Sequence, residues 1–113
     1  MTDSVGIVNA TADDFRDLVS EGTVLVDVWG PQCQPCKVLL PHVEAIAEKY
    51  ADEMKVVKLE APTARRLCME LGIMGLPCLL LFRDGVEVGR LSDPALSPEN
   101  LNQWMDEQRK EVS

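Results

Sequence analysis

The sequence predicts an α/β fold in which a central mixed sheet of about five strands is flanked by four helices. In the first half of the chain, apolar β-branched runs alternate with segments of helical periodicity, as in βαβ units with parallel strands. In the second half, two strand-like runs are joined by Asp84-Gly85, which indicates an antiparallel hairpin. With 113 residues and 46% hydrophobic residues, the chain is expected to form a single domain over residues 1–113.

The first half contains three predicted strands, at residues 5–8, 23–29 and 55–59. Thr11 is the expected N-cap of a first helix, because Asp14 follows three residues later, and this helix is expected to end near Ser20. A long helix is predicted over residues 34–50. Pro41 lies inside it and should kink it, because proline lacks the N–H that a helix interior needs.

The second half contains a short helix, a hairpin and a last helix. The short helix is predicted over residues 64–71 and closes at Gly72. The hairpin strands are predicted at residues 78–83 and 86–91. Ser97-Pro98-Glu99 indicates the start of the last helix, with proline at its first helical position, and the helix is expected to fray over residues 108–113.

Composition and charge exclude several classes of function. The net charge is −8 and the pI is near 4.5, so no basic patch is expected to bind nucleic acid. The longest apolar run, residues 76–82, is far shorter than the roughly 20 residues that span a bilayer. The N-terminus carries no basic stretch followed by an apolar segment, so no secretory signal is expected. Four cysteines without such a signal indicate a reducing compartment, and the cytoplasm is the expected location.

The pair of cysteines in Cys33-Gln34-Pro35-Cys36 lies where a predicted strand gives way to a predicted helix. At that position the unpaired backbone N–H groups and the helix dipole favour a thiolate over a thiol. Cys33 is the candidate nucleophile, because it lies at the exposed end of the helix. Cys36 lies one turn further in and is the candidate resolving cysteine. The spacing therefore predicts a redox centre, and no cofactor or metal is expected.

Several separated motifs agree in order and spacing with one known family. The matching segments are Val26-Asp27-Val28-Trp29, Cys33-Gln34-Pro35-Cys36-Lys37, Pro41, Lys58, and Gly75-Leu76-Pro77 with the strand and turn that follow. On these residues the chain resembles a thioredoxin over nearly its whole length. The resemblance implies the thioredoxin fold, with strand order 1-3-2-4-5. It also implies a reversible Cys33–Cys36 disulfide that reduces disulfides in protein substrates and is itself reduced by a thioredoxin reductase-type donor. A monomer is expected.

The resemblance also implies which residues face a substrate. Pro77 would be the family's cis-proline, presenting a backbone edge to substrate peptides beside the disulfide; the alternative is an ordinary turn proline. The other candidates for substrate contact are Trp29, Gln32, Gln34, Pro35 and Leu76. The chain departs from the family pattern at this same rim, where the differing residues are Gly30-Pro31, Gln32, Gln34, Cys78 and Asp93. We therefore expect the partner specificity, rather than the fold, to differ from that of a typical member.

Asp27 is the second informative residue, because it interrupts an apolar strand. If both faces of this strand are covered, the carboxyl is buried, its pKa is raised, and by resemblance it exchanges a proton with Cys36. The alternative is an aspartate on a solvated face. Lys58 could pair with Asp27 or could be a surface lysine. Trp29 is either a wall beside the disulfide or an ordinary core residue.

Two other classes of function stay open on the sequence. One is a zinc or iron–sulfur module that uses Cys33 and Cys36 with Cys78 or His42, although a structural zinc site usually takes two Cys-x-x-Cys pairs and the chain has one. The other is a thioredoxin-fold domain that binds a protein without turnover. Cys68 and Cys78 are expected to be buried core residues, as free cysteines often are.

Overall fold

A five-stranded mixed sheet, in the order β1-β3-β2-β4-β5, forms the centre of the protein. The computed structural model describes residues 7–92 and 97–112, with side chains described through residue 108. The strands are β1 (Ile7–Ala10), β2 (Thr23–Trp29), β3 (Lys55–Glu60), β4 (Cys78–Arg83) and β5 (Val86–Ser92). Strand β3 pairs in parallel with β1 and β2, whereas β4 is antiparallel to both β2 and β5. The predicted fold class and strand order are confirmed.

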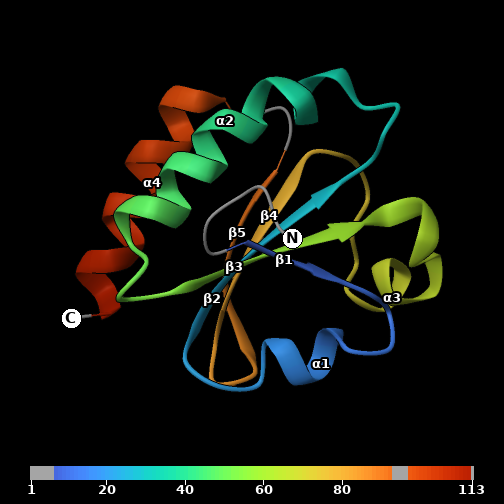
Figure 1. Cartoon of the computed structure of the whole chain (residues 1–113), viewed down its shortest axis with the longest axis horizontal. Coiled ribbons are helices and arrows are strands. Elements are labelled where there is room, and N and C mark those ends of the chain that lie inside the picture. The colour runs from blue at the N-terminus through green and yellow to red at the C-terminus, as the bar shows by residue number, and fades with distance from the viewer. Residues whose placement is uncertain (1–6, 93–96, 113) are drawn as a thin grey trace.

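Helices cover both faces of this sheet. They are α1 (Phe15–Leu18), α2 (Gln34–Lys49), the 3-10 helix η1 (Ala61–Thr63), α3 (Arg65–Glu70) and α4 (Pro98–Val112). Helices α2 and α4 lie together on one face, and α1 and α3 lie on the other (Figure 1). Within the described residues, no helix is long and apolar enough to cross a bilayer.

Strand β2 is deeply buried, because it is central in the sheet and covered on both faces. Val24, Val26 and Val28 pack into the core formed with α1 and α3. Leu25 packs into the second core, formed with α2 and α4. Full burial of such a side chain contributes roughly 1.5–3 kcal/mol each. Asp27 is two residues after Leu25 and therefore lies on the same face of the strand, toward α2. Its carboxyl is buried in this otherwise apolar layer between the sheet and the helix.

The structure corrects the predicted N-terminal elements. The first strand is β1 over Ile7–Ala10, later than the predicted 5–8, and residues 5 and 6 lie outside the described residues. The first helix is only four residues long instead of about ten. Thr11 and Asp14 do form reciprocal bonds: the Thr11 N–H donates to Asp14 Oδ1 at 2.7 Å, and the Asp14 N–H donates to Thr11 Oγ1 at 3.3 Å. These bonds close a turn before α1 rather than a longer helix.

Smaller differences occur elsewhere in the chain. The 3-10 helix η1 was not predicted, and α3 is slightly shorter than the predicted 64–71. Helix α4 continues to Val112, where fraying was expected from residue 108, because no glycine or proline follows Pro98 to stop it. The hairpin is confirmed: Asp84 and Gly85 both adopt positive φ, at 50° and 87°, as a tight turn between twisted strands requires.

Candidate active site

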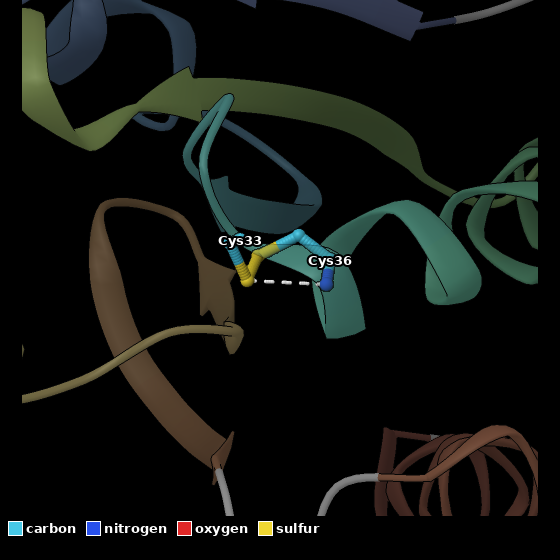
Figure 2. The surroundings of a disulfide bond; sticks show 2 residues. All are labelled: Cys33 and Cys36. Carbon is cyan, nitrogen blue, oxygen red and sulfur yellow. Dashed lines mark hydrogen bonds between the residues drawn. A yellow bond between two sulfur atoms is a disulfide. The ribbon is translucent and has the colours of Figure 1, made fainter.

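A disulfide between Cys33 and Cys36 lies at the N-terminal end of α2 (Figure 2). The two Cα atoms are 5.3 Å apart, within the usual range for a disulfide. Cys33 is the N-cap of α2 and is partly exposed, whereas Cys36 lies one turn into the helix and is 5% exposed. One sulfur can therefore be reached from outside, and the other is covered.

One backbone amide at the start of α2 points toward the outer sulfur. The Cys36 N–H donates to Cys33 Sγ at 3.1 Å, drawn as the dashed line in Figure 2. Pro35 stands in this first turn, where a missing N–H costs no helical hydrogen bond. This donor, together with the positive end of the helix dipole, stabilises negative charge on Cys33 when the disulfide is reduced.

Asp27 lies on β2 and is 3% exposed. Burial raises the pKa of its carboxyl from the ordinary 3.8 to about 6, and the positive charge of Lys58 opposes part of this rise. Asp27 and Cys36 line the same small cavity, of about 60 Å³. A cavity of this size can hold a water molecule between polar groups. The site therefore places a group that can exchange protons near the inner sulfur.

Lys58 and Trp29 form the outer side of that cavity. Lys58 pairs with Asp27 in the register of β2 and β3, as neighbouring residues on adjacent strands. Its ammonium, however, lies 4.6 Å from the centroid of the Trp29 ring, which is a cation–π contact. Lys58 thus acts on Asp27 through its charge, while its ammonium lies over the indole of Trp29.

The loop before β4 packs against the loop that carries Cys33. The Leu76–Pro77 peptide bond is cis, as the resemblance implied, and Pro77 is buried. A Cβ added to Gly30 would lie 3.2 Å from Leu76 Cδ1, so the glycine permits this close approach. Gly30 also accepts a hydrogen bond from the Cys33 N–H at 3.1 Å. The two loops therefore pack together where β2 ends and β4 begins, at one end of the central strands.

Comparison with known proteins agrees with this geometry. A sequence profile described as Thioredoxin matches residues 6–107. The chain belongs to the thioredoxin family. It is 37% identical over 81 residues to a thioredoxin from Bacillus subtilis (strain 168), which covers 72% of this chain and 78% of that protein. A thioredoxin from Acetoanaerobium sticklandii is 33% identical over 91 residues, with 79% and 87% covered. Thioredoxin 1 from Synechococcus elongatus is 37% identical over 90 residues, with 78% and 81% covered.

Family membership and the paired cysteines together define the activity. The chain is a thiol–disulfide oxidoreductase whose redox centre is the Cys33–Cys36 pair. Members of the thioredoxin family act on disulfide-containing substrates and take electrons from a reductase donor, and both are properties of this chain as a member.

The residues that differ from the family pattern are not all at the surface. Pro31, Gln32 and Gln34 are exposed beside Cys33, whereas Gly30 and Cys78 are buried. Among the other predicted contact residues, Pro35 is exposed, and Trp29 and Leu76 are partly exposed. Asp93, the other departure, lies outside the described residues. Gln32 directly precedes Cys33, at the position where the family usually has tryptophan. The side chain next to the outer sulfur is therefore a polar amide rather than an aromatic ring.

The two remaining cysteines belong to the core rather than to the redox centre. Cys68 and Cys78 are free thiols, 8% and 2% exposed, and both pack into the core against α1 and α3. Burial is the main cause that raises the pKa of each thiol. In the part of the chain that the structure describes, no three His, Cys, Asp or Glu side chains are grouped so that they could hold a metal ion, so the metal-centre alternative gains no support there.

Arg90 is a polar residue that the sequence does not single out, and it holds the end of α3 before the Pro77 loop. Arg90 on β5 donates from Nη1 to the Gly72 carbonyl at 3.0 Å and from Nη2 to the Leu71 carbonyl. Its Nε and Nη2 also hold the Glu87 carboxylate, at 2.7 and 2.9 Å. These contacts fasten the C-terminal end of α3 to the hairpin. The two contacts with carbonyls join residues 18 and 19 positions apart, and no local pattern in the sequence indicates them.

Proposed function

We propose that this oxidoreductase works mainly as a reductant of protein disulfides, with Cys33 as the nucleophile and Cys36 as the resolving cysteine. The observation that carries the proposal is the asymmetry of the pair. Cys33 is partly exposed and accepts the Cys36 N–H at the helix N-terminus, while Cys36 is buried. An exposed, amide-stabilised thiolate attacks first, and a covered thiol can only act afterwards.

In the first step, the Cys33 thiolate attacks one sulfur of a substrate disulfide. A bond forms between Cys33 Sγ and that sulfur, and the substrate S–S bond breaks. The second substrate sulfur leaves as a thiolate and takes a proton from solvent. The product is a mixed disulfide between Cys33 and the substrate.

In the second step, Cys36 loses its proton and attacks Cys33 Sγ. The Cys33–Cys36 disulfide forms, and the substrate sulfur leaves as a thiolate that is then protonated. Two electrons have passed from the dithiol to the substrate. Asp27 is proposed to accept the Cys36 proton across the shared cavity, because a carboxyl with a pKa of about 6 changes protonation near neutral pH.

The surroundings of the disulfide are proposed to contact the substrate. Pro77 presents its backbone beside the disulfide, and Trp29, Gln32, Gln34, Pro35 and Leu76 form the rest of the contact surface. The reductase that restores the dithiol would dock on the same surface, because it must reach the same sulfur. Lys58 is proposed to tune the protonation of Asp27 through its charge.

We further propose that the chain acts as a single-domain monomer of residues 1–113 in the cytoplasm. The two free thiols in the core fit a compartment where cysteines stay reduced. The net charge of −8 disfavours nucleic acid and anionic membrane surfaces as partners.

Dithiothreitol-driven reduction of insulin tests this function. Wild type should accelerate the reaction and Cys33→Ser should not. When reduced Cys36→Ser is freed of dithiothreitol and incubated with insulin, it should accumulate a mixed disulfide with the substrate that mass spectrometry detects. Cys68→Ala is the matched control, because it removes a thiol outside the redox centre, and it should keep the wild-type rate. Equal rates for wild type and Cys33→Ser would overturn the proposed function.

A further inference from the structure

An apolar pocket of about 420 Å³ lies between η1, α3 and the loop that leads to Pro77. Its lining is mostly hydrocarbon and thioether. Two of its methionines, Met69 and Met74, are 79% and 96% exposed, although large apolar side chains are usually covered. Methionine is flexible and polarizable, so such residues adapt well to varied apolar partners. The pocket is therefore suited to an apolar side chain of another molecule.

The pocket adjoins the loop that carries Cys33. Pro62 and Leu76 line it, and both also lie against Gly30, where an added Cβ would be 3.8 Å from Pro62 Cδ and 3.2 Å from Leu76 Cδ1. Gly30 in turn accepts the hydrogen bond from the Cys33 N–H. A peptide whose disulfide is attacked by Cys33 can thus extend over the pocket without leaving the surface of the protein.

One wall of the pocket is held in place before any substrate arrives. The wall consists of residues 73–76. The carbonyls of the two residues before it, Leu71 and Gly72, accept hydrogen bonds from the Arg90 guanidinium. The Ile73 N–H also donates to the Cys68 carbonyl at 2.9 Å. A preformed wall lowers the ordering cost of binding.

The charge at the rim of the pocket is opposite to that of the protein as a whole. Arg65, the first residue of α3, is exposed and lines the pocket. Arg66 follows it on the same helix, and the two form the densest basic pair in a chain of net charge −8. In the part of the chain that the structure describes, no carboxylate lies within ion-pair distance of Arg65. Its guanidinium is therefore available to a partner.

We propose that Arg65 is a specificity-determining residue, and that it selects substrates in which an acidic side chain accompanies an apolar one near the disulfide. The apolar side chain enters the pocket, and the carboxylate meets the Arg65 guanidinium. This inference rests on the proposed function, because the occupant is the protein substrate of Cys33. Elsewhere the acidic surface repels such segments, so the basic rim marks where they can dock.

The test uses short synthetic peptides, each with one internal disulfide and a leucine beside the cysteine. One peptide carries glutamates around this segment, and a second carries lysines at the same positions. Wild type, Arg65→Glu and Arg66→Glu are compared by kcat/KM on both peptides. Arg66→Glu is the matched control, because it makes the same charge change one residue away, outside the pocket. Both substitutions place an acid in the first turn of α3, which favours the helix.

Wild type is expected to prefer the acidic peptide. Arg65→Glu should shift the ratio of the two kcat/KM values about tenfold toward the basic peptide, because it removes a surface ion pair with the acidic peptide and adds one with the basic peptide. Arg66→Glu should shift this ratio much less. Bis(2-hydroxyethyl) disulfide, which is small and uncharged, should be reduced equally by all three proteins, and this shows that the variants are folded and active.

Equal shifts with Arg65→Glu and Arg66→Glu, or no shift with either, would overturn the role of Arg65 and leave the proposed function standing. Failure of wild type to reduce any of these disulfides would instead overturn the proposed function itself.

Discussion

Replacing Asp27 by asparagine should stabilise the oxidised protein at neutral and alkaline pH. The carboxyl is 3% exposed, and burial raises its pKa from 3.8 to about 6. In the unfolded chain it ionises near the lower value. Between the two values the folded protein binds more protons than the unfolded chain. Stability therefore falls as pH rises through this window and stays lower above it.

The size of this effect follows from the two pKa values. The difference between 3.8 and about 6 corresponds to a penalty of about 3 kcal/mol in the free energy of unfolding. Asparagine removes the charge and keeps the shape, so it should remove most of that penalty. Because the amide is neutral at every pH, the gain should be about 3 kcal/mol larger at about pH 8 than at about pH 3.

Urea unfolding of the oxidised proteins across this pH range measures the difference. The disulfide form is used because Cys33 and Cys36 do not titrate in it. A Lys58→Met variant serves as a second probe, since loss of the charge that lowers the pKa of Asp27 should deepen the wild-type loss of stability. If Asp27→Asn changed the free energy of unfolding by the same amount at both ends of the range, the buried-charge account would be wrong.

Three further predictions test the fold and the thiols. Leu80→Ala, at a fully buried position, should lower the free energy of unfolding by about 2–5 kcal/mol in urea titrations, and a loss under about 1 kcal/mol would contradict its place in the core. Arg90→Ala should cost about 1–2 kcal/mol in the same assay, with little rescue by Arg90→Lys, which cannot form the forked contact; full rescue by lysine would show that only the charge matters. Cys68 and Cys78 should react with iodoacetamide far more slowly than Cys33 in the reduced protein, because burial raises the pKa of both thiols, and comparable rates by mass spectrometry would refute this.

The sequence predicts elements well where a strong local pattern coincides with tertiary burial. Strand β2 occupies the predicted residues because a run of β-branched residues is covered on both faces. The hairpin forms at Asp84-Gly85 because these residues accept positive φ. The sequence predicts Thr11 as the N-cap of a longer helix, whereas the N-cap of α1 is Asp14 and the Thr11–Asp14 bonds close a turn before it. The length of a short helix depends on packing that no local pattern records.

The site was predictable to the extent that it is local or follows the family pattern. The Cys33–Cys36 pair and the start of helix α2 lie within four consecutive residues, so the sequence predicts them locally. Strand order and the cis bond at Pro77 came from the resemblance rather than from periodicity. The contact of Lys58 with Trp29 depends on side-chain rotamers, and the hydrogen bonds of Arg90 to Leu71 and Gly72 join distant segments of the chain. Neither can be predicted without the structure.

The pH dependence of Cys33 alkylation in the reduced protein probes the role of the α2 amides most directly. Iodoacetamide reacts with the ionised sulfur, and mass spectrometry can follow this one residue. We predict that its rate reaches half of the plateau at a pH clearly below about 8.5, where free cysteine does. A half-maximal rate at or above that pH would contradict stabilisation of the Cys33 thiolate by the N-terminus of α2.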